Sequence, residues 1–473
     1  MNWTLALPEI VLSVAGLAIL VFGVLQRRDA TQLCSMLTLA AFVVTGLLVI
    51  AAPDGIGYNA VFVGDDFARF MKILSLIGAA LSLILSMDYN RREGIGRFEF
   101  PVLLLFSTVG TMVMASSENL MTLFIGLELQ SLAIYILCAF DRDRLGSAEA
   151  GLKYFVLGSL ASGLLLYGIS LVFGFAGTME YRGLQTALAA SAEIPTGLVI
   201  GIVFIIVGLA FKISAVPFHM WTPDVYQGAP PPVTSFMAGA PKIAAFALLL
   251  RVMAGPFGAV SHQWQLLIEL ISMASMLFGA LAAIPQTSIK RLMAYSSIGH
   301  MGYALMGLAA ATPAGMRGTL IYLAIYLFMN AGSFAVIVAM RRRGRAVERI
   351  ADLAGLARTD PGLALAMAIF MFSMIGVPPL SGFFGKLLVF SAALQAGLGV
   401  LVVVGIVSSV IGAYYYLRVV KVMYFDVAAV AFDRPAASVS LVSAGMGLVT
   451  GLFILILGPV SSAAQAAASV LFR

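Results

Sequence analysis

The stretch that decides the fold spans residues 212–251 and reads KISAVPFHMWTPDVYQGAPPPVTSFMAGAPKIAAFALLLR. It opens with Lys212, which ends a long apolar run. Pro217, Pro223 and the following Pro-rich link prevent a continuous helix, because proline lacks the backbone N–H and its ring collides with the preceding turn. A second apolar run then begins around Lys242. Apolar helices that break beside a lysine are typical of membrane segments that line a polar interior.

The composition of the whole chain agrees with a membrane setting. Of 473 residues, 61% are hydrophobic and only 11% are charged, against about 25% charged residues in soluble domains. A water-facing shell needs more polar side chains than 22 acidic and 28 basic residues can supply. The solvent of this chain is therefore lipid.

Several function classes are unsupported by the sequence. Cys34 and Cys138 lie far apart without a Cys-x-x-Cys pair, so a disulfide framework, an iron–sulfur cluster and a zinc site have no basis. The chain has no G-x-G-x-x-G or P-loop motif for a nucleotide. The net charge of +6 does not indicate nucleic acid, because basic residues of membrane chains gather in cytoplasmic loops.

Apolar runs long enough to cross the roughly 30 Å of hydrocarbon occur fourteen times. Continuous runs, as opposed to alternating ones, select helices and not a barrel. We therefore predict an all-α, polytopic bundle of about fourteen transmembrane helices. The predicted helices are Leu7–Leu25, Ala30–Ala52, Phe67–Met87, Phe100–Ser116, Asn119–Phe140, Ser147–Ala176, Pro195–Trp221, Val233–Ala254, Trp264–Ile284, Leu292–Ala310, Thr319–Met340, Pro361–Gln395, Gly397–Phe425 and Ala436–Val460.

The charges between these helices predict the orientation of the bundle. Glu9 and the lack of a positive leader argue against a signal peptide. Connections after odd-numbered helices hold most arginines and lysines, including Lys290, and those after even-numbered helices hold little beyond Arg182 and Arg317. Cytoplasmic loops carry the positive excess, so both termini are predicted on the periplasmic side. We interpret the run RRRGR at residues 341–345 as an anchor of this topology.

Five charges remain inside apolar sequence and need an explanation. They are Glu128, Lys153, Lys212, Lys242 and Lys386. Each costs about 2.5–3.5 kcal/mol at a helix centre, so together they cost as much as the net stability of a whole domain, about 5–15 kcal/mol. For Lys153, near its helix start, snorkelling to the surface is an equal alternative. For the other four, function outweighs a purely structural ion pair.

The helix breaks suggest an internal repeat. The seventh helix breaks after Lys212, and the twelfth breaks at GVPPLSGFFGK before Lys386. Each broken helix is the fourth helix of a five-helix unit. Because five is odd, two such units in tandem lie in opposite orientations across the membrane, which is the plan of many ion transporters. We predict a single membrane domain with helices 1–3 in 1–99, the two inverted repeats in 100–254 and 262–425, and the last helix in 436–460.

The buried charges fit proton chemistry better than other cargo. A lysine in low dielectric loses its proton more easily, and a nearby carboxylate restores the charge. A Glu128–Lys212 pair that opens and closes would therefore change the proton affinity of Lys212. His219 and His300 could relay protons, although each is equally well read as a hydrogen-bonded structural residue. No group of carboxylates suggests a metal ion.

These residues resemble a known family. The stretch at 212–251, the Glu128 helix, IKRLMAYSSIGHMGY at 289–303 and IGVPPLSGFFGKLLVF at 375–390 are similar to the antiporter-like subunit N of respiratory complex I, the proton-pumping NADH:quinone oxidoreductase. The resemblance extends over the full chain. Related Mrp-type sodium/proton antiporter subunits share the broken lysine helix and are the alternative.

The resemblance implies a proton-translocating membrane-arm subunit without a redox centre. Its partners are then other membrane-arm subunits and the lipid bilayer, and NADH, FMN, iron–sulfur clusters and quinone belong to other subunits. It assigns the proton path to Glu128, Lys212, Lys242 and Lys386, with Lys153 and His300 matched less securely. The Ala-, Gly- and Arg-rich composition favours a bacterial inner membrane. A structural spacer whose charges only fix helix packing is the third hypothesis.

Overall fold

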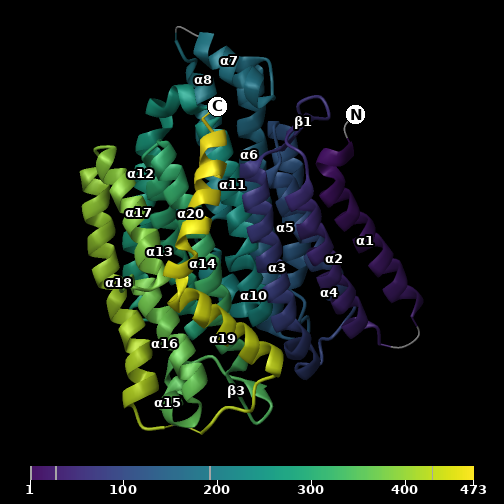
Figure 1. Cartoon of the computed structure of the whole chain (residues 1–473), viewed down its shortest axis with the longest axis vertical. Helices are drawn as coiled ribbons and strands as arrows, with labels where there is room; N and C mark the ends of the chain where they lie inside the picture. The colour runs from purple at the N-terminus through teal and green to yellow at the C-terminus, as the bar shows by residue number, and fades with distance from the viewer. Residues whose placement is uncertain (1–2, 27–28, 191–192, 429, 473) are drawn as a thin grey trace.

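The computed structural model describes residues 3–26, 29–190, 193–428 and 430–472, and most of them are helical (Figure 1). The first half contains α1 (Leu7–Leu25), α2 (Thr31–Ala51), α3 (Asp66–Arg92), α4 (Glu99–Ala115), α5 (Leu120–Cys138), α6 (Leu145–Ala176), α7 (Tyr181–Ala190), α8 (Thr196–Lys212), α9 (Thr222–Gly228), α10 (Pro231–Ala238) and α11 (Ala240–Ala254). The second half contains α12 (Ser261–Ala283), α13 (Ile289–Ala309), α14 (Pro313–Ala339), α15 (Leu356–Thr359), α16 (Pro361–Ile375), α17 (Ser381–Gln395), α18 (Gly399–Phe425), α19 (Ala437–Gly451) and α20 (Phe453–Val470).

Strands occur only as two small antiparallel hairpins in the described ranges. One joins β1 (Gly55–Gly57) to β2 (Phe62–Gly64), and the other joins β3 (Arg341–Arg342) to β4 (Arg345–Ala346). Short 3-10 helices are η1 (Trp3–Ala6), η2 (Gly258–Val260) and η3 (Ile350–Leu353). The two hairpins lie at opposite ends of the helical bundle (Figure 1).

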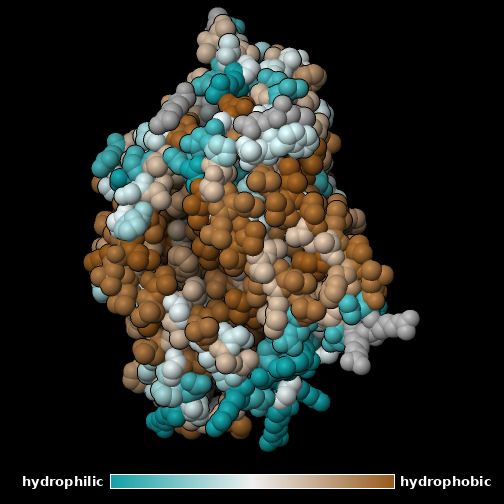
Figure 2. Space-filling view, turned by 45° about the vertical axis from the view of Figure 1, so that its right-hand side comes forward, coloured by the Kyte–Doolittle hydropathy of each residue, from teal (hydrophilic) through white to brown (hydrophobic). Residues whose placement is uncertain are grey.

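The helices give the chain the dimensions of a multi-pass membrane protein. Ten of the described helical segments are long and apolar enough to cross a bilayer, and four more apolar helices are shorter. Figure 2 shows a broad hydrophobic band across the middle of the face in view, with hydrophilic residues gathered toward both ends. A band of this kind matches the hydrocarbon layer of a bilayer between its two polar interfaces.

The core is built around α10, α11 and α14. The apolar segment Pro231–Ala254 is completely buried, and that of α14 is 94% buried. By contrast, fewer than half of the residues in the apolar windows of α1, α2, α6, α18 and α20 are buried, as expected of helices that face lipid. The central helices therefore meet protein on all sides, and polar groups on them face other side chains instead of lipid.

Both predicted helix breaks are confirmed. α8 ends at Lys212, and nine residues separate it from α9. α16 ends at Ile375 and is followed by Gly376, whose φ of 97° is a left-handed conformation that favours glycine, and α17 begins at Ser381. The intervening prolines cannot continue either helix.

The structure differs from the predicted helices in three places. α7 is an additional short helix in the link after α6. The predicted eighth helix is interrupted at Gly239, between α10 and α11, because Pro241 cannot supply a backbone N–H to the turn before it. The last helix extends beyond the predicted Val460 to Val470, with an interruption at Leu452, because the Ala- and Ser-rich continuation has good helix propensity without strong hydropathy.

The ends of the bundle are distinct. The N- and C-termini lie at the same end, together with β1 and α7 (Figure 1). β3 and α15 lie at the opposite end. We call these the terminal end and the basic end, since the second carries the RRRGR run at 341–345.

Candidate functional site

Lys212 is held at the end of α8 by neutral groups. Its side chain is 5% exposed, and Nζ donates to Ser131 Oγ at 2.8 Å and to Tyr135 Oη at 3.3 Å. The ring of Tyr135 also lies 5.6 Å from Nζ, within the range of a cation–π contact. Both partners come from α5, one helical turn apart, so the face of α5 that carries them forms the Lys212 site.

Glu128 lies on the same face of α5, one turn before Ser131. It is partly buried and accepts a hydrogen bond from Ser162 Oγ of α6. The carboxylate forms no direct ion pair with Lys212 among the described residues. Ser131 and Tyr135 therefore accept the hydrogen bonds of the Lys212 ammonium, and the Glu128 carboxylate lies one helical turn before Ser131 on α5. Glu128 and the two residues that bind Lys212 thus share one face of α5, and the predicted Glu128–Lys212 pair forms no direct ion pair in the described ranges.

Lys242 is buried too deeply to exchange protons directly with solvent at the surface. It is 1% exposed, and Nζ donates to Ser297 Oγ of α13 at 2.7 Å. Ser297 in turn lies 2.7 Å from Tyr326 Oη of α14. The ring of Tyr226 packs 5.3 Å from the ammonium. Lys242 therefore connects to two hydroxyl groups in series and to no carboxylate in the described chain.

His300 lies one turn after Ser297 on α13 and is 3% exposed. Its Nδ1 is hydrogen-bonded to Tyr322 Oη at 2.6 Å, and its Nε2 to Tyr416 Oη at 3.1 Å. Tyr416 also contacts Ser296 Oγ at 2.5 Å. The imidazole is therefore satisfied on both nitrogens and joins α14 to α18 through hydroxyl groups.

Lys386 of α17 lies beside the second helix break. Its Nζ donates to the carbonyls of Met374 and Ile375 at 3.0 and 2.8 Å and to Ser409 Oγ at 2.7 Å. These carbonyls have lost their helical partners where α16 ends. The broken helix thus supplies the acceptors for the lysine, as expected for irregular backbone inside a membrane.

A small cavity lies between His300 and Lys386. It has a volume of about 10 Å³, close to the space that one water molecule needs. Ser408, whose buried Oγ has no hydrogen-bond partner in the described ranges, lines it together with Tyr416 and Ser409. A polar cavity of this size between a histidine and a lysine suits an ordered water.

Two of the predicted site residues lie apart from this row. The Lys153 side chain is 40% exposed and forms ion pairs with Glu149 at 2.6 Å and Asp224 at 2.7 Å. Its surface position supports the snorkelling alternative. His219 lies in the break after α8, half-buried, with its ring 4.5 Å from the ring of Phe278. It makes no hydrogen bond to the lysine row within the described part of the chain.

Sequence reasoning missed several buried charges. Lys290, assigned to a loop, is 1% exposed and donates to the Ala229 carbonyl at 2.9 Å; that assignment was wrong, because the link around α9 folds over it. Glu9 of α1 and Lys72 of α3 form a buried ion pair at 2.7 Å. Their only signal was a charge in the first turns of apolar helices.

Metal-ligating side chains are scattered in the described part of the chain. Within the residues that the structure describes, no three His, Cys, Asp or Glu side chains come together as a metal-binding group would require. The groups that do come together are lysines, a histidine, hydroxyls and one carboxylate. Such groups exchange protons along hydrogen bonds without covalent chemistry.

Broken membrane helices with buried lysines that form no ion pair in the described ranges are typical of an antiporter-like membrane protein. Comparison with known proteins agrees with that class. The family described as "NADH:quinone oxidoreductase/Mrp antiporter, TM" matches residues 117–412. NADH-quinone oxidoreductase subunit N of Gluconacetobacter diazotrophicus is 71% identical, and that of Granulibacter bethesdensis is 63% identical, each over all of both chains.

Solved structures show the same relationship. A chain of respiratory complex I from Thermus thermophilus with bound aureothin is 31% identical, with a TM-score of 0.82, and the match covers 97% of this chain and 99% of that one. A chain of the Mrp complex from Dietzia sp. DQ12-45-1b has a TM-score of 0.87 at 23% identity, with 100% and 98% covered, and shares the fold. The chain belongs to the NADH:quinone oxidoreductase/Mrp antiporter family, in its group of NADH-quinone oxidoreductase N subunits.

Proposed function

We propose that this chain is a proton-translocating membrane-arm subunit of an NADH:quinone oxidoreductase, driven by quinone reduction elsewhere in the complex. The observation that carries the proposal is the row of Lys212, Lys242 and Lys386, each buried and bonded only to neutral groups. High identity to subunit N of two bacteria supports the assignment to this enzyme complex. Protons move along the row as lysines lose and regain charge.

The path has two stretches. In the first, Glu128 and Lys212 exchange a proton when their separation changes, with Ser131 and Tyr135 of α5 between them. In the second, Lys242 passes a proton through Ser297 toward the cluster around His300. Hydroxyl groups suit this task because each both donates and accepts.

The second stretch ends at Lys386. The His300 imidazole and the Lys386 ammonium face the same small cavity, so one water between them would complete the connection. Lys153 and His219 take no place in the row and serve at most as surface groups near the ends of the path.

We further propose fourteen membrane crossings built from two inverted five-helix repeats, 100–254 and 262–425. The repeats would carry the broken helices α8/α9 and α16/α17. The lysine comes before the break in the first repeat and after it in the second. Helices of residues 1–99 and the last helix pair then flank the repeats.

The orientation follows from charge. The basic end would face the cytoplasm of a bacterium, and the terminal end, with both termini, the periplasm. The chain would contact lipid through its hydrophobic band and other membrane-arm subunits of the complex through part of its sides. NADH, FMN, iron–sulfur clusters and quinone would be bound by those other subunits, with none in this chain.

A sodium/proton antiporter subunit is the less supported alternative. The likeness to the Mrp chain is one of fold at 23% identity, whereas the likeness to subunit N reaches 71% identity. The two functions differ in an accessible measurement, since an Mrp-type subunit would exchange cations for protons in vesicles without NADH.

The test of the proposal is Lys212→Ala in the native complex, reconstituted into sealed vesicles and driven by NADH. We expect coupled turnover to fall by at least about tenfold, which is less than the roughly 10²–10⁴-fold that general acid–base groups contribute to catalysis. Lys421→Ala is the matched control, because the Lys421 side chain is 62% exposed. Normal pumping by an intact Lys212→Ala complex would overturn the proposed path.

A further inference from the structure

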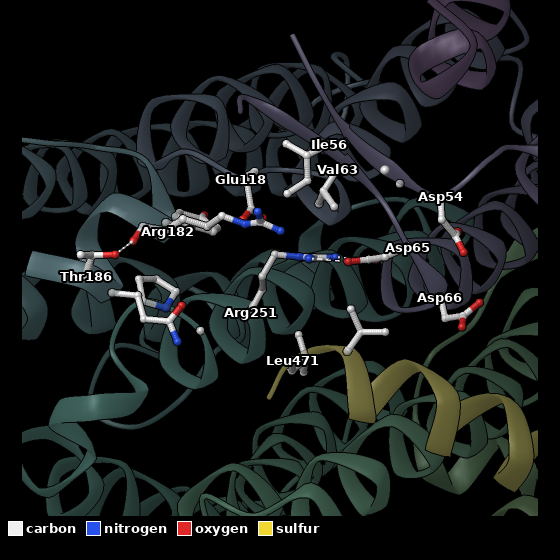
Figure 3. Close-up of a pocket in the computed structure, with 17 residues that line it drawn as sticks. Asp54, Ile56, Val63, Asp65, Asp66, Glu118, Arg182, Thr186, Arg251 and Leu471 are labelled. Carbon is white, nitrogen blue, oxygen red and sulfur yellow. Dashed lines mark hydrogen bonds and ion pairs between the residues drawn. The ribbon is translucent and has the colours of Figure 1, made fainter. Parts of the chain in front are cut away.

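A pocket of about 650 Å³ opens at the terminal end of the molecule (Figure 3). Its walls come from the β1–β2 hairpin, the start of α3, the link between α4 and α5, α7, the end of α11 and the end of α20. These segments are far apart in sequence and come together at this pocket. The proposed lysine row does not use this pocket, although it holds buried charges.

Two of those charges neutralise each other. Arg251 donates from its two terminal nitrogens, Nη1 and Nη2, to the Asp65 carboxylate at 2.8 and 2.9 Å (Figure 3). Nη2 also donates to the Ala115 carbonyl at 3.2 Å. A bidentate pair of this kind fixes both side chains in place. The pair therefore forms a rigid wall of the pocket and is not available to exchange protons.

Glu118 differs from this pair. It is 9% exposed, and its backbone is fixed on both sides, with its N–H bonded to the Val61 carbonyl at 3.2 Å and its carbonyl accepting from the Tyr181 N–H at 3.1 Å. Its carboxylate lines the pocket but forms no hydrogen bond or ion pair with the described residues. Arg182 of α7 reaches into the same space (Figure 3).

The surroundings of Glu118 favour proton exchange. Burial raises the pKa of its carboxyl above the usual value, and the positive charge of Arg251 opposes the shift only in part. Asp65 raises this pKa further and Arg182 lowers it. A carboxyl without a fixed donor can take up and release a proton without breaking an ion pair.

The pocket also lies at the ends of two helices of the lysine row. Glu118 lies two residues before the start of α5 at Leu120, and Glu128 lies about 12 Å along α5 from that start, at 1.5 Å per residue. Arg251 follows Lys242 on α11 by about 13.5 Å on the same rise. The residues between Lys242 and Arg251 are apolar and buried. A barrier of this kind separates the row from the pocket until the structure rearranges.

We propose that this pocket is the aqueous mouth of the proton path at the terminal end, and that Glu118 exchanges protons between the row and the water there. The carboxylate accepts one proton from the path and becomes neutral, then gives that proton to water and regains its charge. The inference rests on the proposed function, and it adds an exchange site outside the row.

The first test is Glu118→Gln in the intact, reconstituted complex, with Glu180→Gln as the control. Glu180 is an exposed carboxylate close in sequence to α7 that does not line the pocket. We expect NADH-driven proton pumping to fall by at least about tenfold in Glu118→Gln and to stay unchanged in Glu180→Gln. Unchanged pumping in Glu118→Gln would overturn the inference.

A conservative variant covers the case in which Glu118→Gln does not assemble. Glu118→Asp keeps an exchangeable carboxyl of lower intrinsic pKa. We expect its pH profile of pumping to shift toward lower pH than that of the wild type. A complex with an unshifted profile would also count against Glu118 as the exchange group.

The third test asks whether water reaches the pocket from the periplasm. In spheroplasts, Glu118→Cys should react with a membrane-impermeant maleimide, and the background is low because Cys34 and Cys138 are buried. Absence of labelling would overturn the proposal that the pocket is an aqueous mouth of the proton path. If Lys212→Ala stops pumping while Glu118→Gln pumps normally, the proposed function stands and this inference fails. Normal pumping in Lys212→Ala would instead remove the function itself.

Discussion

At the scale of single residues, the buried lysines share one kind of environment. Lys212, Lys242 and Lys386 are bonded to hydroxyls and carbonyls, and none of them forms an ion pair within the described residues. A lysine paired with a carboxylate would hold its proton firmly. Neutral acceptors leave the ammonium satisfied but replaceable, so a small change in the surroundings suffices to release the proton.

The Lys242→Met substitution separates function from packing. Because Lys242 is fully surrounded by protein and its acceptor Ser297 also contacts Tyr326, an apolar chain of similar length should fit, and buried charges are often replaced without loss of stability. We expect an unchanged melting temperature and a fall of at least about tenfold in coupled turnover. Lys421→Met serves as the exposed control. A fully active Lys242→Met complex would support the spacer hypothesis.

The sequence identified the charged members of the row but not their partners. Lysines in apolar helices are conspicuous because of their cost. Ser131, Ser297, Ser409 and Tyr416 are not, since serine and tyrosine occur throughout membrane helices with many roles. Which hydroxyl meets which lysine depends on helix rotation and depth, which emerge only from packing between helices distant in sequence.

Asp65 gives a pH-dependent prediction. Burial acts to raise the pKa of its carboxyl, but the charge and hydrogen bonds of Arg251 outweigh it, so the net pKa lies below the ordinary value of 3.8. A carboxyl whose pKa is lower in the folded than in the unfolded protein stabilises the folded state at any pH above its unfolded-state pKa. This stabilisation is lost as the pH falls through the pKa of the carboxyl in the folded state.

We therefore expect Asp65→Asn to be less stable than the wild type at pH 7, by about 3–5 kcal/mol for a broken buried pair. The difference should narrow as the pH approaches 3. Thermal inactivation of the purified complex across this pH range measures it. A difference that does not change with pH would show that Asp65 acts through packing alone.

At the scale of elements, apolar length and proline position predicted most helices. α1 has the predicted bounds, and both broken helices lie where the prolines require. Two of the three misses share a cause: α7 is short and amphipathic, and the end of α20 is rich in alanine and serine. Neither has the continuous hydropathy that reveals a membrane helix.

Helix contacts at glycine give a prediction for one element pair. A side chain at Gly110 of α4 would place its Cβ 2.4 Å from the Gln130 backbone nitrogen of α5. Gly110→Ala must therefore push these helices apart, at a cost of about 1–3 kcal/mol. The control is Gly163→Ala on the exposed face of α6, where a Cβ meets nothing within 4 Å and the helix gains propensity.

Thermal stability of the two variants in detergent gives the comparison. The expected order is Gly110→Ala below the wild type and Gly163→Ala equal to or above it. Because α5 carries Glu128, Ser131 and Tyr135, loosening the α4–α5 contact should also lower coupled turnover. Equal stability of the two variants would contradict the close contact.

At the scale of the whole molecule, the two ends differ in charge and in what they expose. The basic end carries the β3–β4 hairpin, where Arg341 is buried against Glu93. The terminal end carries both termini and the charged pocket of Figure 3. By the positive-inside rule, the end with the arginine-rich hairpin is the one expected in the cytoplasm.

Cysteine labelling checks the orientation directly. Ala346→Cys, in β4 at the basic end, and Gln395→Cys, at the end of α17, are both exposed positions. Spheroplasts expose the periplasmic face to an impermeant maleimide, and inverted vesicles expose the cytoplasmic face. We therefore expect Gln395→Cys to react in spheroplasts and Ala346→Cys to react only in inverted vesicles. The opposite pattern would place the termini in the cytoplasm.

The complete burial of α11 has a consequence for how the protein is made. Ser297, the acceptor of Lys242, lies 55 residues later in the chain, so the ribosome delivers this lysine to the insertion machinery before its partner has been synthesised. α3, α4 and α8, which pack against α11, have already been synthesised by then. The nascent helix can therefore pack against the first half of the chain at once, but the ammonium of Lys242 lacks its serine acceptor until α13 arrives.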